Sequence, residues 1–404
     1  MPFIIPNQTT TALQKPIPVQ SGWTRPADWI TITDTPNEVQ FLFCDVSLPS
    51  IAIEGSVSGG SFWWVDWGDG SSPTQYTTGS TAKKVFTSGG TPSVLGYNMW
   101  KIRVYCVDAG TTLTNTKIVN NVDYFSLQGA PSGLLEAVYG DGTQSVGFYA
   151  LFAGATSPAP YVPNHYNLQY VKLPSSCSAS GAIFDYTFAS CYGLRKIVMP
   201  VSAPNNTQYI ETFRFCYSLS EPLVLPQDNT TAITGGFNSC FANCASITSI
   251  TLPPSLPNVS NMASAFNVCS SLTTIDIPAT PNCLNYNGMF ANCRNLQSYE
   301  FKTFDITAVG LINIGSMFQN CPSFSYIKLP STFSVGKTFD MANMFASCGS
   351  LDSVVFPSNM DATTMSAAFQ NCYSLASVVL PTTMPSLTTM ATAFQNCQNL
   401  QSIP

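Results

Sequence analysis

From about residue 165 to the end, apolar residues recur in a unit of the form F-x-x-C-x-x-L-x-x-I/V-x-L/F-P. One copy comprises Phe266, Cys269, Leu272, Ile275, Ile277 and Pro278, and others begin at Phe188, Phe318 and Phe369. The cysteines of this unit stand 24 to 28 residues apart, at Cys191, Cys216, Cys244, Cys269, Cys293, Cys321, Cys348, Cys372 and Cys397. A period in the twenties predicts a solenoid, whose coils bury their apolar side chains only by stacking on one another.

Each unit is expected to contain a short strand and a short helical turn. The last two apolar positions of L-x-x-I-x-L are two residues apart, so they lie on one face of a strand, and proline ends that strand. The stretch Met365–Phe369 has apolar residues at i and i+4, which predicts a short helix or 3₁₀ turn. The predicted fold class is therefore β-rich α+β.

The repeat unit resembles the BspA-type leucine-rich repeat, A-F-x-x-C-x-x-L-x-x-I-x-L-P, in nine clear coils within residues 166–404. This resemblance implies a right-handed solenoid with a parallel sheet on its concave face. It also implies a role in surface adhesion.

Residues 36–125 show another pattern, in which short aromatic and β-branched runs alternate with Gly, Ser, Thr and Pro, so we predict strands there. All six tryptophans lie before residue 101, which indicates a separate core. The tight turn Asp66-Trp67-Gly68-Asp69-Gly70-Ser71 and the alternating strand 97–105 resemble the polycystic-kidney-disease (PKD) type immunoglobulin-like sandwich. We interpret Asp66 and Asp69 as turn-forming residues; a metal or catalytic pair is the alternative.

Residues 1–35 carry five prolines and no strand or helix periodicity, which predicts an extended arm. We interpret it as an anchor that docks onto a larger assembly, with a flexible linker as the alternative. Within it, the stretch Gly22–Trp29 resembles the R-P-x-D-W lead-in before such sandwiches in bacteriophage virion proteins. The N-terminus shows no charged segment followed by an apolar one, so no secretory signal is predicted. Residues 126–165 are assigned to a connector and a degenerate first coil.

The composition excludes several function classes. Charged residues make up only 9% of the chain and the net charge is −6, so we expect no nucleic-acid partner. No apolar run reaches the roughly 18 residues that a membrane span needs, so no membrane insertion is expected. His165 is the single histidine, which rules out histidine metal clusters and leaves one candidate for any triad.

The fourteen cysteines comprise the nine of the repeat column and five others, Cys44, Cys106, Cys177, Cys240 and Cys283. None forms a zinc-type CxxC pair. We interpret the column cysteines as small buried residues with a weak S–H donor. A disulfide ladder and a metal site are the alternatives, and no cofactor is predicted.

The residue between the last two apolar positions of each strand faces outward. The resulting column reads Lys172, Val198, Val224, Thr251, Asp276, Glu300, Lys328, Val355 and Val379. Adjacent strands lie about 4.8 Å apart, so Asp276, Glu300 and Lys328 should be neighbours. Two carboxylates about 5 Å apart suit a retaining glycosidase; the alternative is a solvated stripe in which Lys328 neutralises one acid. With Lys172 and Tyr326, these three residues form the candidate binding surface.

The same column becomes apolar at Val355 and Val379, which form a candidate interface. No polar capping coil follows them, although solenoids need one for solubility. Either this end forms an interface or the sequence belongs to a longer protein.

Together these features predict a non-enzymatic bacteriophage virion protein, assembled in the host cytoplasm and exposed on the particle. Its arm would bind other virion proteins, the chain would form a homo-oligomer, and the solenoid would contact a host-surface glycan or protein. The alternatives are a bacterial cell-surface adhesin, or a solenoid polysaccharide-degrading enzyme using Asp276 and Glu300.

Overall fold

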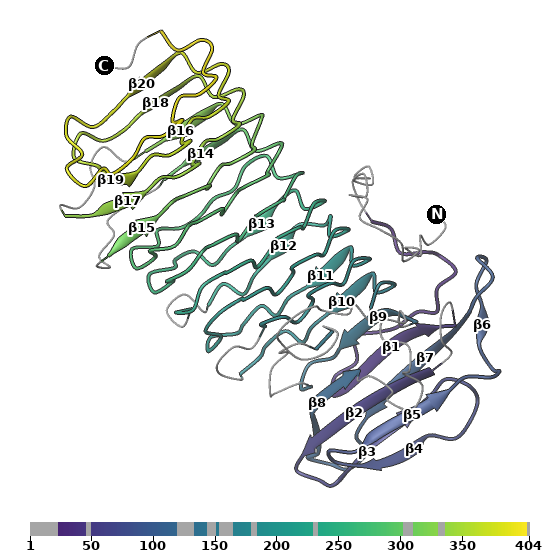
Figure 1. Ribbon diagram of the computed structural model, residues 1–404. Coiled ribbons are helices and arrows are strands. Elements are labelled where there is room, and N and C mark those ends of the chain that lie inside the picture. The colour runs from purple at the N-terminus through teal and green to yellow at the C-terminus, as the bar shows by residue number, and fades with distance from the viewer. Residues whose placement is uncertain are drawn as a thin grey trace.

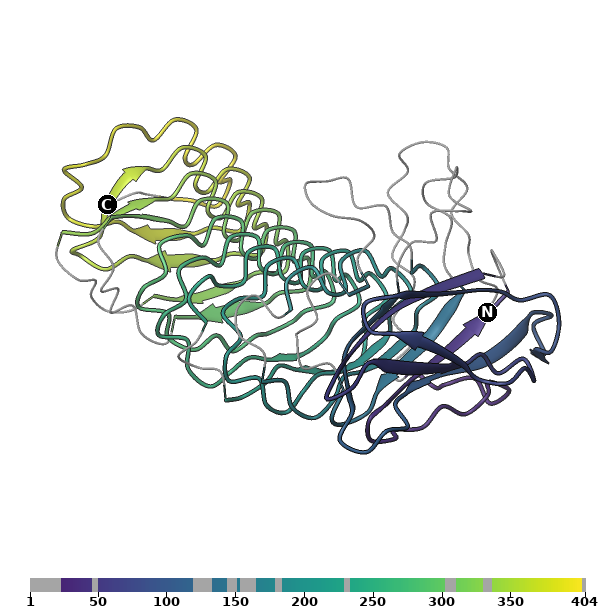
Figure 2. The same ribbon diagram turned by 90° about the horizontal axis from the view of Figure 1, so that it is seen from below.

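The computed structural model describes residues 23–45, 50–118, 133–143, 151–152, 165–178, 184–228, 233–301, 310–329 and 336–401. Within these ranges every regular element is a β-strand, so the predicted short helices are wrong and the fold is all-β. The molecule is elongated, with a sandwich at one end and a stack of coils extending from it (Figures 1 and 2).

The N-terminal region is built from two antiparallel sheets. One contains β1 (Glu38–Cys44), β3 (Phe62–Asp66), β4 (Thr74–Thr77), β6 (Thr91–Pro92), β7 (Asn98–Tyr105) and β9 (Leu134–Tyr139). The other runs in the order β5 (Thr81–Val85), β2 (Ser50–Ser58), β8 (Thr112–Ile118). Alternating side chains of the two sheets, such as Phe41, Ile53, Trp63 and Leu113, are fully buried in a common core.

The turn after β3 is held by its two aspartates. Asp66 Oδ1 accepts the Gly68 amide at 3.0 Å, and Asp69 Oδ1 accepts the Ser71 amide at 3.1 Å. Partial burial disfavours the ionised form of Asp69, but hydrogen bonds from Lys84 and Ser71 outweigh it and lower its pKa to about 2. The aspartates therefore act as turn residues, as their sequence pattern predicted.

The sheet of the sandwich continues into the solenoid through β9. This strand pairs antiparallel with β1 and parallel with β10 (Tyr170–Lys172), which in turn pairs with β11 (Lys196–Val198). One sheet thus runs β11-β10-β9-β1-β7-β3-β4 across the junction (Figure 1). The first coils are consequently joined to the sandwich by backbone hydrogen bonds.

Residues 23–35 cover the outer face of this sheet. All seven residues of β1 are buried, because Leu42 and Cys44 pack beneath Trp29 while alternate residues face the inner core. The Trp29 indole donates to the Tyr97 hydroxyl at 2.8 Å. This part of the predicted arm therefore packs against its own sandwich. Residues 1–22 lie outside the described residues, so docking onto other virion proteins remains a prediction.

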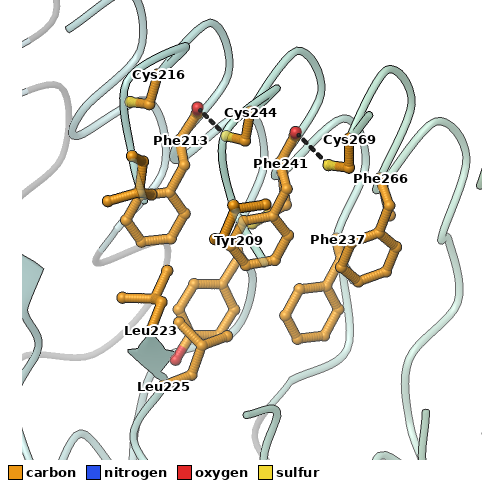
Figure 3. Packing of buried hydrophobic residues seen from close by; sticks show 14 of the residues in the cluster. Tyr209, Phe213, Cys216, Leu223, Leu225, Phe237, Phe241, Cys244, Phe266 and Cys269 are labelled. Atoms are coloured by element: carbon orange, nitrogen blue, oxygen red, sulfur yellow. Dashed lines mark hydrogen bonds between the residues drawn. The ribbon is translucent and has the colours of Figure 1, made fainter. Parts of the chain in front are cut away.

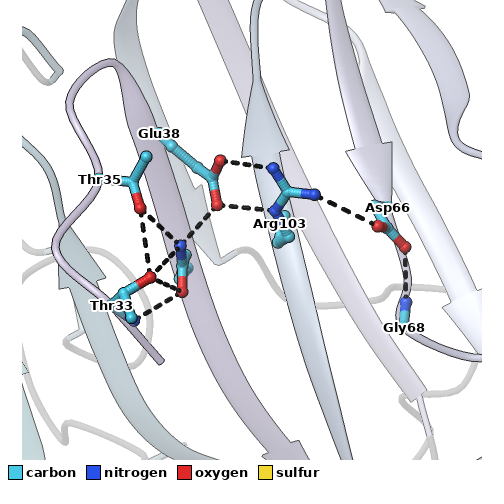
Figure 4. A network of polar contacts seen from close by, with 7 residues as sticks. Thr33, Thr35, Glu38, Asp66, Gly68 and Arg103 are labelled. Atoms are coloured by element: carbon cyan, nitrogen blue, oxygen red, sulfur yellow. Dashed lines mark hydrogen bonds and ion pairs between the residues drawn. The ribbon is translucent and has the colours of Figure 1, made fainter. Parts of the chain in front are cut away.

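Ion pairs fix the same segment to the sheet. Arg25 Nε donates to Glu136 Oε1 at 2.8 Å, and the Glu136 side chain has no exposed surface. Burial raises the pKa of Glu136 by more than Arg25 lowers it. A second network joins Gln40, Glu38, Arg103 and Asp66 (Figure 4), with Arg103 Nε 2.8 Å from Glu38 Oε1.

Most coils of the described solenoid contribute a short strand to one side of the stack, whereas the coil that carries Asp276 has no regular strand there. These leucine-side strands continue from β10 and β11 as β12 (Leu223–Val224), β13 (Ile250–Thr251), β14 (Ser298–Glu300), β16 (Tyr326–Lys328), β18 (Ser353–Val355) and β20 (Ser377–Val379). Paired neighbours are parallel, with outward residues of adjacent coils in register. A second parallel sheet, β15 (Leu311–Asn313), β17 (Thr338–Asp340) and β19 (Asp361–Thr364), was not predicted.

The stretch expected to be helical is a chain of turns. Ala367 and Asn371 have φ values of 52° and 63°, and a left-handed residue ends any right-handed helix. The amides of Ala367 and Phe369 donate to the next coil at 2.9 and 2.8 Å, whereas those of Ala368 and Gln370 bond back three residues. Alternate amides thus join the coils as in a parallel sheet. The same pair of left-handed positions recurs at Ser264 and Val268.

The repeated phenylalanines form one continuous buried stack. Ring centroids of Phe266, Phe290 and Phe318 are 5.4 and 5.6 Å apart, with planes inclined by only 16° and 17°. Figure 3 shows Phe213, Phe241 and Phe266 in the same arrangement. This alignment confirms the predicted columns.

Candidate binding surface

Glu300 and Lys328 lie side by side on the exposed face of the leucine-side strands. Parallel pairing of β14 with β16 sets Glu300 opposite Lys328, and the two form an ion pair with more than half of each side chain exposed. Asp276 is exposed in the preceding coil, which the Gln297 amide joins to the Thr273 carbonyl at 3.1 Å. The three predicted neighbours therefore lie in one row, and Lys328 is engaged with one of the acids.

The other two members of the candidate surface stand apart from one another. Lys172 lies at the junction, where it ion-pairs with Asp34. Tyr326 lies on β16 beside the Glu300–Lys328 pair, and 56% of its surface is exposed. Tyr326 is thus an exposed aromatic residue next to the Glu300–Lys328 pair, and Lys172 belongs to a different part of the molecule.

Apolar side chains extend along the same face. Val355 and Val379 are 65% and 44% exposed at paired positions of β18 and β20, and Val224 is 52% exposed on β12. These valines point away from the core because their neighbours Val354 and Val378 fill it. Their role as an interface remains a prediction.

The buried column thiols and His165 are held in their uncharged forms. Each column thiol donates to the phenylalanine carbonyl of the preceding coil, as Cys244 does to Phe213 at 3.0 Å and Cys269 to Phe241 at 3.2 Å (Figure 3). Burial raises the pKa of these thiols well above the usual value, which makes them inert. None of the column cysteines is in a disulfide. Burial also lowers the pKa of His165 to about 4.

No metal centre or membrane span emerges from the residues that are described. In these ranges no three His, Cys, Asp or Glu side chains gather as a metal site. The same ranges contain no apolar helix of membrane-crossing length.

A tyrosine column escaped the sequence analysis. Tyr192 and Tyr217 directly follow the cysteines of two adjacent coils, and Tyr166 holds the corresponding place in the coil before them. Their ring centroids are 5.0 and 5.2 Å apart. An aromatic residue next to cysteine in consecutive repeats was the available signal.

A polar residue five positions before the phenylalanine in the later coils, which caps the turn segment, was also missed. The side chains of Asn261, Asn313 and Asp340 each accept the amide two residues ahead, at 2.9, 2.9 and 3.0 Å. These Asx turns begin the turn segment in successive coils. The Asn, Asp or Thr at a constant distance before phenylalanine would have identified them.

Comparison with known proteins supports the repeat assignment. The sequence matches the BspA type leucine-rich repeat region in six copies, over residues 161–240, 211–339 and 306–401, which together exceed half of the chain. A leucine-rich cell surface protein from Faecalibacterium prausnitzii A2-165 is similar to 74% of this chain and 93% of its own, with 16% identity and a TM-score of 0.26. No curated protein matches the sequence. The chain belongs to the BspA-type leucine-rich repeat family.

Proposed function

We propose that this protein is a non-enzymatic adhesion protein of a cell surface, which binds its ligand on the exposed face of the solenoid. The observation that carries the proposal is the outward row on the leucine-side strands. There Val224, Tyr326, Val355 and Val379 are between 44% and 65% exposed, among polar side chains. Apolar side chains gathered on an open, regular sheet mark an interaction surface. Membership of the BspA-type family supports the same conclusion.

The geometry of the acidic pair supports binding rather than catalysis. A retaining glycosidase needs one carboxylic acid that is kept protonated in an enclosed site. Glu300 instead faces solvent and pairs with Lys328. The Glu300–Lys328 row therefore suits contact with a polar ligand.

Adhesion and hydrolysis can be measured on the same preparation. We expect the purified full chain to bind intact cells and to release no reducing sugar from polysaccharides. The double variant Asp276→Asn and Glu300→Gln is expected to keep its fold. Hydrolysis that these substitutions abolish without unfolding the protein would establish the enzymatic alternative instead.

Whether the protein is displayed on a cell surface or on a phage particle is tested separately. The sequence predicts a virion, but no comparison points to one, and the family assignment favours a cell surface. Mass spectrometry of fractionated cells should find the chain in the envelope fraction. Its recovery only from purified phage particles, starting at residue 1 or 2, would return it to the virion.

A further inference from the structure

Tyrosines stand in adjacent coils next to the sandwich. The position after the column cysteine holds Tyr192 and Tyr217 there, but Ala245, Ser270, Arg294, Pro322 and Gly349 in the following coils, and it holds tyrosine again at the isolated Tyr373. All of these coils stack with the same buried core, so stacking does not require tyrosine at that position. Tyr217 is 42% exposed, so much of its ring gains no hydrophobic free energy on folding and is available to a ligand. Coil stacking alone therefore does not explain the adjacent tyrosines.

The backbone is shaped to bring these rings together. A Cβ on Gly193 would lie 2.2 Å from the Tyr166 carbonyl oxygen, so only glycine permits this approach between the two coils. The rings of Tyr166 and Tyr192 are inclined by 56°, and those of Tyr192 and Tyr217 by 50°. The column thus presents ring edges and faces in alternation, with three hydroxyl groups.

A row of polar side chains runs beside the tyrosines. The Arg195 amide donates to the Gln169 carbonyl at 2.9 Å, so these residues lie side by side, three positions after Tyr192 and Tyr166. Beyond them, Trp23 stacks on Tyr170 with centroids 6.0 Å apart, and its indole donates to Gln169 Oε1 at 3.3 Å. The amide and guanidinium row is therefore bordered by aromatic rings on both sides along the coil.

This row carries two positive charges that form no ion pair with the described residues. Lys172, Arg214 and Lys328 in the described solenoid are all ion-paired, with Asp34, Glu211 and Glu300. Arg195 and Lys196 form no ion pair with any described residue. The nearby Glu221 carboxylate accepts the Trp23 amide at 2.7 Å and forms no ion pair with either cation. Arg195 and Lys196 are therefore two adjacent, partly exposed cations without an ion-pair partner among the described residues.

We propose that Tyr166, Tyr192, Tyr217, Gln169, Arg195 and Lys196 form a binding site for an acidic glycan, whose sugars bear carboxylates. The apolar C–H face of a pyranose packs on a tyrosine ring, because both surfaces leave water. Arginine binds a carboxylate with two parallel hydrogen bonds, and lysine adds a second charge. The Gln169 amide and the tyrosine hydroxyls match sugar hydroxyls. The site rests on the proposed adhesive function and names its ligand class.

The test measures binding of the full chain to immobilised polygalacturonate, hyaluronan and polysialic acid. Fully methyl-esterified polygalacturonate is the matched neutral ligand. We expect at least one acidic polymer to bind, and Tyr217→Ala and Arg195→Gln each to weaken binding about tenfold. Two controls occupy the same position after the column cysteine in other coils. Tyr373→Ala removes a 48% exposed tyrosine from a coil that lacks the Gln169–Arg195 row. Arg294→Gln removes a cation from another coil that also lacks this row. Both controls should bind like the unchanged protein.

Three results would overturn the site: no binding to any acidic polymer, equal binding of the esterified polymer, or equal losses in the control variants. Far-UV circular dichroism and melting of Tyr217→Ala check its fold, which should survive because other coils carry alanine or serine there. Cell adhesion is measured in parallel. If the unchanged protein adheres to cells but binds no acidic glycan, this site is refuted and the proposed function stands. If the unchanged protein shows neither adhesion nor glycan binding, both proposals are refuted.

Discussion

At the residue scale, backbone conformation explains why asparagine often precedes the column cysteine. Asn243, Asn292 and Asn371 have φ values of 66°, 65° and 63°, and asparagine tolerates this left-handed region better than most residues. Val268 occupies the same position with φ of 62°. A β-branched residue is strained in this conformation, so Val268 lowers the stability of its coil.

Replacing this valine should stabilise the protein. We expect Val268→Asn to raise the free energy of unfolding by about 1 kcal/mol, because it removes the steric cost of a left-handed β-branched residue. The reverse change, Asn243→Val, should lower it by a similar amount. Urea denaturation measures both. Equal stability of Val268→Asn and the unchanged protein would show that the strain is relieved elsewhere.

The buried thiols should make the protein sensitive to alkali. Burial raises the pKa of Cys293 well above the usual value and that of Cys372 to about 12, whereas unfolded cysteines ionise near pH 8.5. The unfolded state therefore loses protons first, so the contribution of the thiols to stability is constant below about pH 8.5 and falls as pH rises toward 12. Between its pKa in the unfolded state and its pKa in the folded state, each buried thiol lowers the free energy of unfolding by about 1.4 kcal/mol per pH unit.

Urea midpoints between pH 7 and pH 10 measure this decline. A Cys293→Ala variant should show a shallower slope than the unchanged protein, by the share of one thiol. A slope that does not change with this substitution would mean that other groups cause the alkaline loss.

At the scale of the element, the phenylalanine stack should dominate the stability of the coils. Phe290 is fully buried between Phe266 and Phe318, so Phe290→Ala leaves a cavity and should cost about 3–5 kcal/mol. Phe394 is only partly buried and stacks on Phe369, so Phe394→Ala should cost clearly less. Thermal melting compares the two variants. Equal losses would contradict a stack whose contacts add from coil to coil.

The same elements show what sequence patterns can predict. The spacing of Phe266, Phe290 and Phe318 predicted the stack, because a buried column needs one large apolar residue in every coil. The turn segment was predicted as helical because i, i+4 apolar spacing also fits a chain of turns. The left-handed residues Ala367 and Asn371 decide between the two, and alanine is not a typical residue for that conformation.

At the scale of the whole molecule, the junction between sandwich and solenoid was not predictable. The strand β9 lies within the segment assigned as a connector, yet it pairs with β1 and β10. Its partners are distant in sequence, and local patterns do not report such pairings. Similarly, the exposed position of Glu300 was predictable from the strand period, but the gathering of Trp23 beside Gln169 depends on a contact across 146 residues. The candidate glycan site therefore required the structure.

The continuous sheet implies that the sandwich and the first coils unfold together, and two built-in probes can test this. All six tryptophans lie before residue 101, so fluorescence reports the sandwich, while labelling of Cys191 and Cys216 reports the adjacent coils. In urea both signals should change at one midpoint. Arg25→Met leaves the fully buried Glu136 without its partner, which should cost about 3 kcal/mol and lower that shared midpoint.

A control variant distinguishes this junction from ion pairs in general. Lys328→Gln breaks a pair on the open face, where solvent replaces the lost partner, so its midpoints should stay unchanged. If the fluorescence transition of the unchanged protein preceded thiol labelling at Cys191, the shared sheet would not couple the two regions. Coincident transitions that Arg25→Met moves together would instead show that residues 23–35 brace the base of the solenoid, on which every later coil is stacked.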